Sequence, residues 1–192
     1  MLSDMRHGAR NSPTRRAAQA LPVWLALFAW LSLLSPRLSA EPVPEYDLKA
    51  AFVYNFALFT EWPANVVFEG GNLNICVNPG NPLHQSLSAL GEKRIKGKRI
   101  VVRQTVAPDN LAGCHVLLLD SNDRERWMQI RKALDGTSVL TIADDDDIGH
   151  DGSIITLVPD NHRMVFDIDL RAARQARLVL SSKLLRLART VQ

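Results

Sequence analysis

KAAFVYNFALFTEWP, residues 49–63, is the most informative segment of the chain. Phe52, Phe56 and Phe59 recur at helical spacing, so the segment is predicted to be a helix with one broad apolar face. Pro63 disfavours helical geometry at the residue before it, and the helix is therefore predicted to end at the Glu-Trp-Pro sequence. Most of this apolar stripe is expected to be core.

Three residues of the segment carry polar groups that need partners if they are buried. They are Tyr54, Asn55 and Trp62. They are either satisfied core residues or contacts for a partner or ligand, and we keep them as candidate binding residues.

The first 40 residues have the layout of a secretory signal peptide. Arginines precede the apolar run 21–34, which is followed by Pro36 and the small pair Ser39-Ala40. That run is shorter than the roughly 20 residues needed to span a bilayer. We expect cleavage after Ala40, with residues 41–192 exported to the periplasm; a retained membrane anchor is the alternative.

Removal of the signal peptide changes the charge balance. Residues 1–40 hold five of the 23 basic and one of the 20 acidic residues, which leaves 18 against 19 and a formal net charge of −1. Nucleic-acid binding needs a basic surplus on the folded domain, so we expect no nucleic-acid partner. The remaining length suits one domain with a substantial core.

The two cysteines, Cys76 and Cys114, both lie in the predicted mature part. An exported chain in an oxidising compartment usually pairs its cysteines, and each of these lies at a predicted strand. A disulfide is favoured, and two buried thiols are the alternative. Two isolated cysteines lack the paired spacing of a zinc site, so no metal is expected there.

Helical and strand patterns alternate along the rest of the chain. Strands are predicted at 73–78, 99–104, 115–119 and 138–142, and helices at 82–90 and 123–134. Asn81 before Pro82 is predicted to cap the first of these helices, and Asp123 the second.

The C-terminal part adds a hairpin and two helices. Predicted strands 154–158 and 163–168 flank a Pro-Asp-Asn-His turn, and helices are predicted at 169–177 and 183–189, the latter capped by Ser181 or Ser182. The expected fold is α/β, a single-domain mixed sheet that is largely parallel, with a C-terminal antiparallel hairpin and flanking helices.

Catalytic motifs are lacking. The sequence contains no GxSxG, HExxH or phosphate-binding loop. His115 beside Cys114 suggests a thiol–imidazole pair, but a disulfide would remove the nucleophile. We expect a protein that is not an enzyme and needs no cofactor.

The run Asp144 to Asp147 is the best candidate for binding a cation. Its register does not fit a calcium-binding EF-hand loop, because Val158 stands where the bidentate glutamate belongs. A solvated acidic turn, with a basic segment as its neighbour, is the favoured interpretation.

The basic neighbour is expected to come from the C-terminal segment. Its cations are Arg171, Arg174, Arg177, Lys183, Arg186 and Arg189. Four of them are candidates for holding an acidic partner loop, an anionic ligand or lipid headgroups: Arg171, Arg174, Lys183 and Arg186. An ordinary solvated helix face is the alternative. The leucines between them, 178, 180, 184, 185 and 187, are expected in the core or in a dimer contact.

The carboxyl ends of the predicted parallel strands offer a second kind of site. Polar residues follow these strands at 78–80, 120–121 and 143–144, where an anionic or aromatic small molecule would find amide groups of helix 82–90. Ordinary Asx turns account for the same residues.

Nearly the whole mature chain resembles the YfiR family of small periplasmic proteins. The resemblance rests on KAAFVYNFALFTEWP, the strand containing Cys76, LAGCHV (111–116), VLTIAD (139–144) and VFDIDLRAARQARLVLSSKLLRLAR (165–189). Two features depart from the family pattern: Arg177 stands where glycine is expected, and the run 144–147 is unusually acidic.

The resemblance implies a non-catalytic regulator. Such a protein binds the periplasmic domain of an inner-membrane diguanylate cyclase, or of a related sensor protein, and lowers cyclic-di-GMP signalling and biofilm growth in response to redox or envelope state. It also implies a homodimer and a disulfide at Cys76 and Cys114. The alternative is a solute-binding module that feeds a sensor kinase, with the strand-end loops as its pocket.

Overall fold

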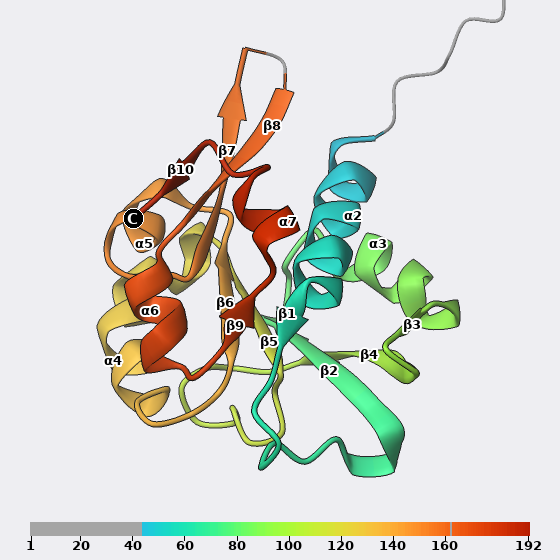
Figure 1. Ribbon diagram of the computed structural model, residues 1–192. Helices are drawn as coiled ribbons and strands as arrows, with labels where there is room; N and C mark the ends of the chain where they lie inside the picture. The colour runs from blue at the N-terminus through green and yellow to red at the C-terminus, as the bar shows by residue number, and fades with distance from the viewer. Residues whose placement is uncertain (1–43, 162) are drawn as a thin grey trace, which may run out of the picture. The chain divides into compact units, whose positions relative to one another are not determined.

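A mixed sheet organises the fold (Figure 1). The structure, a computed structural model, describes residues 44–161 and 163–192; the predicted signal peptide and its cleavage site lie outside this part. The main sheet contains β2 (Asn72–Val77), β3 (Arg94–Ile95), β4 (Lys98–Gln104), β5 (Val116–Leu119), β6 (Leu140–Ala143), β7 (Ile155–Asp160), β8 (Arg163–Ile168) and β10 (Thr190–Val191). Their order across the sheet is β10-β8-β7-β6-β5-β2-β4-β3.

Most neighbouring strands in this sheet are parallel. The β2–β4, β2–β5, β5–β6, β6–β7 and β10–β8 pairs are parallel, whereas the β7–β8 and β3–β4 hairpins are antiparallel. A separate antiparallel pair joins β1 (Thr60–Glu61) to β9 (Val179–Leu180). The predicted fold class, a largely parallel mixed sheet with a C-terminal antiparallel hairpin, is confirmed.

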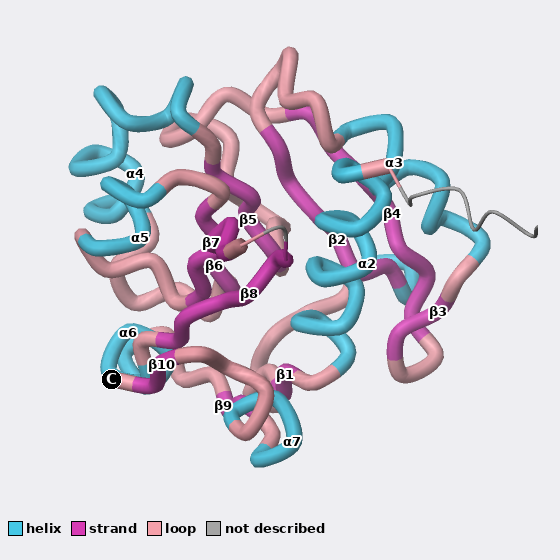
Figure 2. The backbone as a smooth tube through the Cα atoms, turned by 90° about the horizontal axis from the view of Figure 1, so that it is seen from above, coloured by secondary structure: helices cyan, strands magenta, loops and turns pink. Residues whose placement is uncertain are grey.

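Helices cover both faces of the sheet. They are α2 (Glu45–Leu58), α3 (His84–Ser88), α4 (Trp127–Ala133), α5 (Asp146–His150), α6 (Leu170–Gln175) and α7 (Ser182–Leu185), with 3-10 turns η1 (Glu69–Gly71), η2 (Ala89–Glu92) and η3 (Ser121–Arg126). Figure 2 shows α4 and α5 on one side of the sheet and α2 with α3 on the other. None of the helices in the two described ranges is both long and apolar enough to cross a membrane.

The strands distribute their side chains between two apolar layers, as the two-residue period of a strand requires. Ile75 and Val116 belong to the larger layer, which packs under α2, whereas Cys76 and Leu117 belong to the smaller layer under α4. Phe56 anchors the larger layer, because its ring packs edge-on against Phe166 with centroids 4.8 Å apart. We call these layers the α2 face and the cysteine face.

The aromatic helix ends earlier than predicted. It stops at Leu58, although Pro63 was expected to set its end near Trp62. Thr60 leaves the helix because its backbone pairs with Leu180 in the β1–β9 ribbon, while its hydroxyl donates to the Phe56 carbonyl at 2.7 Å. The tertiary pairing overrides the local proline signal.

Two predicted caps need correction. Asp120, not Asp123, is the N-cap of the turn η3 that leads into α4, and Asp123 is the third residue of the same capping box. Asn81 accepts a hydrogen bond from the Leu83 amide at 2.9 Å, but the α3 helix begins only at His84. Ser181 caps α7, as one of the two predicted alternatives.

Candidate functional site

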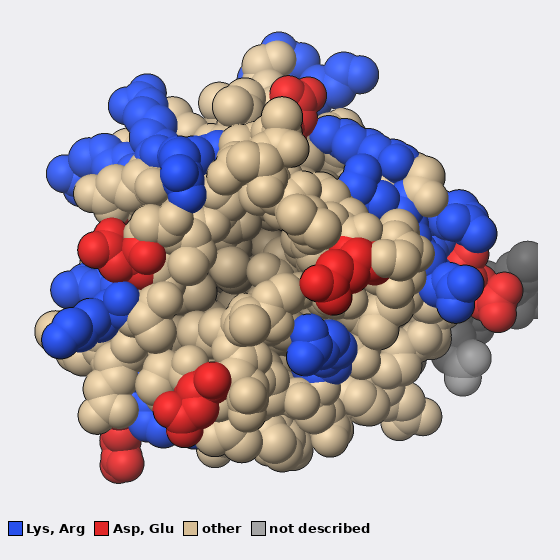
Figure 3. All heavy atoms as spheres, turned by 90° about the horizontal axis from the view of Figure 1, so that it is seen from below, with Lys and Arg blue, Asp and Glu red and all other residues tan. Residues whose placement is uncertain are grey.

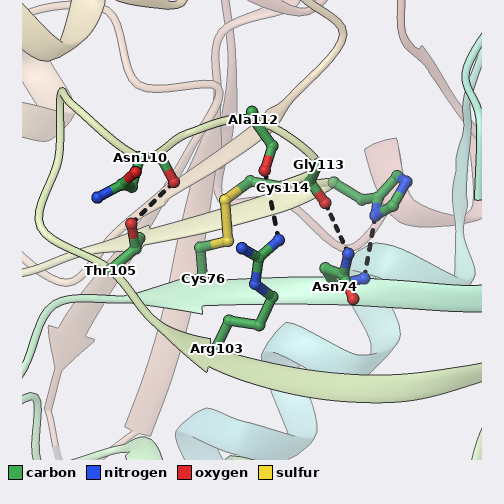
Figure 4. Close-up of a disulfide and its surroundings, with 9 residues drawn as sticks. Asn74, Cys76, Arg103, Thr105, Asn110, Ala112, Gly113 and Cys114 are labelled. Carbon is green, nitrogen blue, oxygen red and sulfur yellow. Dashed lines mark hydrogen bonds between the residues drawn. A yellow bond between two sulfur atoms is a disulfide. The ribbon is translucent and has the colours of Figure 1, made fainter. Parts of the chain in front are cut away.

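The structure joins Cys76 and Cys114 in a disulfide with a Cα–Cα distance of 5.8 Å, within the usual range (Figure 4). Cys76 lies inside β2, and Cys114 comes two residues before β5. These strands pair in parallel, with Cys76 opposite Leu117, so the sheet register brings the two sulfurs together. Cys76 is fully buried, whereas 6% of Cys114 is exposed.

His115, next to the disulfide, is a buried clamp between two segments. Its Nδ1 accepts the Asn74 amide at 3.0 Å, so Nε2 carries the proton and donates to the Val67 carbonyl at 3.1 Å. Burial lowers the pKa of His115, the Val67 carbonyl opposes this shift, and the Lys98 charge adds to it. The histidine is therefore a neutral structural group, and the bonded Cys114 offers it no thiol to activate.

A short aromatic chain leads from His115 to Trp62. The Phe68 ring stacks on the imidazole, with centroids 4.3 Å apart and planes 7° apart. Trp62 meets Phe68 edge-on at 6.1 Å, and Lys98 Nζ lies 4.4 Å from the centre of the Phe68 ring. Trp62 is thus connected to the disulfide through two intermediate rings.

Trp62 also lines a small cavity, of about 250 Å³, at the start of the basic hairpin β3–β4. We call this cavity the Trp62 recess; its lining residues are Thr60, Glu61, Trp62, Phe68, Leu73, Ile95, Lys96 and Lys98. Lys96 Nζ donates to the Thr60 carbonyl at 3.0 Å and lies 4.0 Å from the Glu61 carboxylate. Among the described residues, the indole Nε1 of Trp62 is buried without a hydrogen-bond acceptor.

Lys96 and Lys98 were missed by the sequence reasoning. The signal was present in the run KRIKGKR, residues 93–99, which holds five basic residues out of seven. The run attracts attention only once the fold places it beside Trp62, about 35 residues earlier in the sequence.

Tyr54 and Asn55 do not line the Trp62 recess. The Tyr54 hydroxyl donates to the Arg94 carbonyl at 3.3 Å, and Lys93 Nζ lies 5.3 Å from its ring centre. Asn55 donates to the carbonyl of Ala51 one helical turn earlier, at 2.8 Å. Both polar groups therefore have partners within the chain.

The C-terminal cations are divided between two helices. Arg171 and Arg174 are exposed on α6, whereas Lys183 lies on α7 and Arg186 follows it. Figures 1 and 2 both show α6 and α7 apart, so the four cations come from two separate parts of the C-terminal segment. Of the leucines between them, 178, 180 and 184 are core, and Leu187 is 68% exposed.

The acidic run is only partly the solvated turn that was expected: Asp146 and Asp147 are exposed, whereas Asp144 and Asp145 are engaged by basic side chains. Asp144 accepts from Lys49 Nζ at 2.8 Å, and Asp145 is bonded by Arg124 while capping α5 through the Ile148 amide at 3.1 Å. The basic neighbours are thus Lys49 and Arg124 instead of the C-terminal segment. The Arg124 hydrogen bond lowers the pKa of Asp145, while burial raises the pKa of Asp144. Within residues 44–161 and 163–192, no group of three or more His, Cys, Asp or Glu side chains could hold a metal ion.

The strand ends are filled by their own side chains, and Asn81 and Asp120 accept from backbone amides two residues on, as the alternative of ordinary Asx turns predicts. Asn78 donates to Asp120 at 3.0 Å and to Asp123 at 2.9 Å, and Asn81 donates to Asp120 at 2.7 Å. Burial raises the pKa of Asp123, and the Asn78 hydrogen bond opposes that shift. This buried network closes the carboxyl edge of the sheet.

Larger hollows lie elsewhere. A groove of about 690 Å³ runs between α4 and α6, and a cavity of about 500 Å³ lies beside Cys114 at the amino end of β5. Figure 3 shows an uncharged hollow near the middle of one face, with Lys and Arg around its periphery interrupted by Asp and Glu. We call the cavity of about 500 Å³ beside Cys114 the Cys114 cavity.

Comparison with known proteins gives one family and one fold. A family described as YfiR/HmsC-like matches residues 46–189. The crystal structure of a conserved domain protein from Vibrio cholerae O1 biovar El Tor strain N16961 is similar, with a TM-score of 0.52 and 13% sequence identity. That similarity covers 78% of this chain and 61% of the Vibrio chain, so this chain spans less than two thirds of it, and the likeness concerns the fold alone. No curated protein matches the sequence.

Proposed function

The chain belongs to the YfiR/HmsC-like family of periplasmic regulators, and from this premise we propose that it binds and inhibits the periplasmic domain of an inner-membrane diguanylate cyclase. In this proposal the protein acts by binding and not by catalysis. Its release from the cyclase, in response to redox or envelope state, raises cyclic-di-GMP.

The Trp62 recess is the structural observation that supports a binding role. It combines a tryptophan, the residue type most enriched at the energetic centres of interfaces, with two ammonium groups. The indole N–H lacks an acceptor, and Lys98 faces an aromatic ring instead of a carboxylate. An acidic loop of the partner, with one carboxylate beside the Lys96 and Lys98 ammonium groups and the loop covering the indole, fits the recess.

The disulfide gives this surface a route to redox control. Cys114 and His115 are consecutive, His115 stacks on Phe68, and Phe68 holds Trp62 edge-on. Opening the disulfide frees the segment before β5 and loosens the clamp that His115 makes on Val67. The population then shifts away from the form in which the recess is preorganised for the partner.

We also propose that the protein forms a homodimer. Leu187 and Val179 are 68% and 60% exposed on the C-terminal part of the chain, and such side chains are stabilised when a second copy covers them. Sedimentation of the purified domain, with Leu187→Glu as the variant, tests this part: a dimer that survives the variant unchanged would exclude Leu187 from the interface.

Deletion and complementation test the central claim. Deletion of the gene is expected to raise cellular cyclic-di-GMP and biofilm growth, and the wild-type chain is expected to restore both. Trp62→Ala combined with Lys98→Glu is expected to fold and reach the periplasm without restoring repression. The first change removes the indole from the recess, and the second replaces a positive charge by a negative one. Unchanged cyclic-di-GMP on deletion would remove the proposal.

A matched control comes from the opposite side of the sheet. Met128→Ala combined with Lys132→Glu makes the same kind of change on the exposed face of α4, in the groove between α4 and α6 and away from the Trp62 recess. This variant is expected to repress as the wild type does. Equal loss of repression in both double variants would show that the recess is not the contact surface.

A second candidate function rests on the groove between α4 and α6. At about 690 Å³ it is large enough for a small molecule, and Arg171 on its rim offers a charge. A periplasmic solute-binding module feeding a sensor kinase would use it. Ligand-dependent melting shifts of the purified domain, lost in Ala172→Trp, would favour this function over cyclase control.

A further inference from the structure

The surroundings of the two sulfurs differ, and we propose that the disulfide is opened from one side: a small thiol attacks Cys114 through the Cys114 cavity, while Arg103 stabilises Cys76 as the departing thiolate. The inference deepens the proposed redox response and takes that response as its premise. It names the sulfur that reacts, the residue that assists and the class of reductant.

Access distinguishes the two sulfurs. Cys76 has no exposed surface and lies in β2, which has β4 on one side and β5 on the other. Cys114 precedes β5 and lines a cavity of about 500 Å³, together with Leu111, Ala112 and Gly113. A nucleophile must approach a disulfide sulfur from the side opposite the departing sulfur. The cavity offers such an approach to Cys114, whereas Cys76 is covered by the sheet and the cysteine face.

The chemistry is an ordinary thiol–disulfide exchange. A thiolate bonds to Sγ of Cys114, the S–S bond breaks, and its electron pair leaves on Sγ of Cys76, which then takes a proton from solvent. A second thiol attacks the mixed disulfide and releases the oxidised reductant with a free Cys114. Two external thiols are oxidised, and one protein disulfide is reduced to two thiols.

Arg103 is placed to assist the departing sulfur. It lies directly opposite Cys76 in the parallel β2–β4 register, and partners in such a register project to the same side of the sheet. Its guanidinium reaches across the disulfide side of the strands and donates to the Ala112 carbonyl at 3.3 Å (Figure 4). A Cβ built on Gly113 would lie 3.3 Å from Arg103 Nη1, which places the cation against the turn that carries Cys114.

A nearby cation matters because Cys76 departs into apolar surroundings. It lies opposite Leu117 in a layer that also holds Leu119 and Trp127, and burial in such a layer disfavours a thiolate. A guanidinium beside the sulfur favours the charged form, and a more stable thiolate leaves faster. Arg103 is therefore a positioning and electrostatic residue that does not itself react.

The lining of the Cys114 cavity selects the reductant. Its charged residues are Glu69 and Asp109, both acidic. They disfavour a thiol that carries a further negative charge, so the reductant class is a small thiol whose other groups are neutral or cationic. 2-Mercaptoethanol is the neutral probe for the experiment.

The first test asks which sulfur reacts. Purified oxidised protein is exposed briefly to 2-mercaptoethanol, quenched with acid, alkylated with N-ethylmaleimide and mapped by mass spectrometry. The mercaptoethanol adduct is expected on Cys114 and the maleimide on Cys76. Adducts on Cys76, or an equal distribution, would overturn the proposal.

The second test measures the rate of opening in variants of one strand. Arg103→Gln is expected to slow the reaction with 2-mercaptoethanol roughly threefold, since loss of a nearby opposite charge raises a thiol pKa by about one unit and exchange rates follow by about half a log. Arg103→Lys is expected to keep the rate within about twofold, because it keeps the charge. Arg99→Gln removes the same charge about 13 Å away along β4 and is expected to change nothing.

A purely structural role for Arg103 gives a different result. If its bond to Ala112 only holds the turn in place, Arg103→Gln loosens the turn and accelerates opening, and Arg103→Lys does the same. Melting temperatures of all variants show which are folded. Both assays use the isolated protein without a cyclase, so failure here leaves the regulatory proposal intact, and failure of the deletion experiment leaves the reaction at Cys114 intact.

Discussion

The two faces of the sheet are stabilised by different means. The α2 face is the larger layer and is filled by aromatic rings, with Phe56, Phe52 and Phe166 in mutual contact. The cysteine face is smaller and combines a disulfide with the short helices α4 and α5. A large layer gains enough from burial to close without a covalent bond, whereas a small one gains less. A redox response is therefore more easily built into the smaller cysteine face than into the α2 face.

The largest effect is expected at the centre of the α2 face. Phe56→Ala should lower the free energy of unfolding by about 3 to 5 kcal/mol, because Phe56 is only 1% exposed and removal of its ring leaves a cavity between two other rings. Urea unfolding measures the change. Tyr46→Ala, at a position 47% exposed on the same helix, should cost far less; a similar cost for both would mean that the α2 face is not the stable one.

Loss of the disulfide is the corresponding test of the cysteine face. The Cys76→Ala, Cys114→Ala double variant should lose about 2 to 4 kcal/mol of unfolding free energy, since the bond closes a loop with a sequence separation of 38. Reduction of the wild type should approach the same value. If neither change lowers the urea midpoint, packing alone closes this face and the contrast between the two faces fails.

A smaller loss is expected where α5 joins the cysteine face. Asp145→Ala should cost about 1 to 2 kcal/mol, because it removes both the cap on the Ile148 amide and the partner of Arg124. Asp146→Ala, one residue along and exposed, should cost under about 0.5 kcal/mol. Thermal melting of the two variants side by side gives the comparison; equal melting points would mean that the cap is not needed.

The end of the sheet at His115, where the imidazole stacks on Phe68, should be acid-sensitive. The folded pKa of His115 is lowered below its ordinary value of about 6.5, so the native state binds fewer protons than the unfolded chain. The stability that the buried, neutral His115 contributes to the folded state is complete above the unfolded pKa. It is lost as the pH falls from there through the folded pKa. Urea midpoints at pH 7.5 and 5.5 should therefore differ more in the wild type than in His115→Gln.

The smallest effect is expected at the end of α6. Arg177 has a φ of 57°, a left-handed geometry in which glycine is free of strain, and its amide closes the helix end on the Arg174 carbonyl at 2.9 Å. Arg177→Gly should stabilise the domain by less than about 1 kcal/mol, the relief of strain being partly offset by loss of its bond to the Gly136 carbonyl. Arg177→Ala loses that bond and keeps the strain, so it should destabilise; stabilisation by alanine would contradict this explanation.

The longer elements could be predicted because their periodicity is strong. Six of the eight strands of the main sheet, including the antiparallel hairpin β7–β8, and the aromatic helix follow from apolar spacing and turn residues. The two-residue strands β1, β3, β9 and β10 could not be predicted, because two residues have no measurable period. Their pairing also moved the end of α2 from Trp62 back to Leu58.

The candidate site was predictable in its chemistry but not in its assembly. Cys76, Cys114 and Trp62 stand out in the sequence, yet nothing local shows that His115 and Phe68 connect them. The basic partner of the acidic run was placed in the wrong segment, because ion pairs such as Lys49 with Asp144 join residues 95 positions apart. Long-range pairs of this kind are set by topology and not by neighbouring residues.

Tryptophan placement offers an optical consequence. Trp62 and Trp127 are the indoles of the described part of the chain; one is packed with the α2 face and the other is buried in the cysteine face. Replacing either by phenylalanine leaves a single fluorophore whose emission reports on one side of the molecule. Loosening of the two sides can then be timed separately in the same stopped-flow experiment.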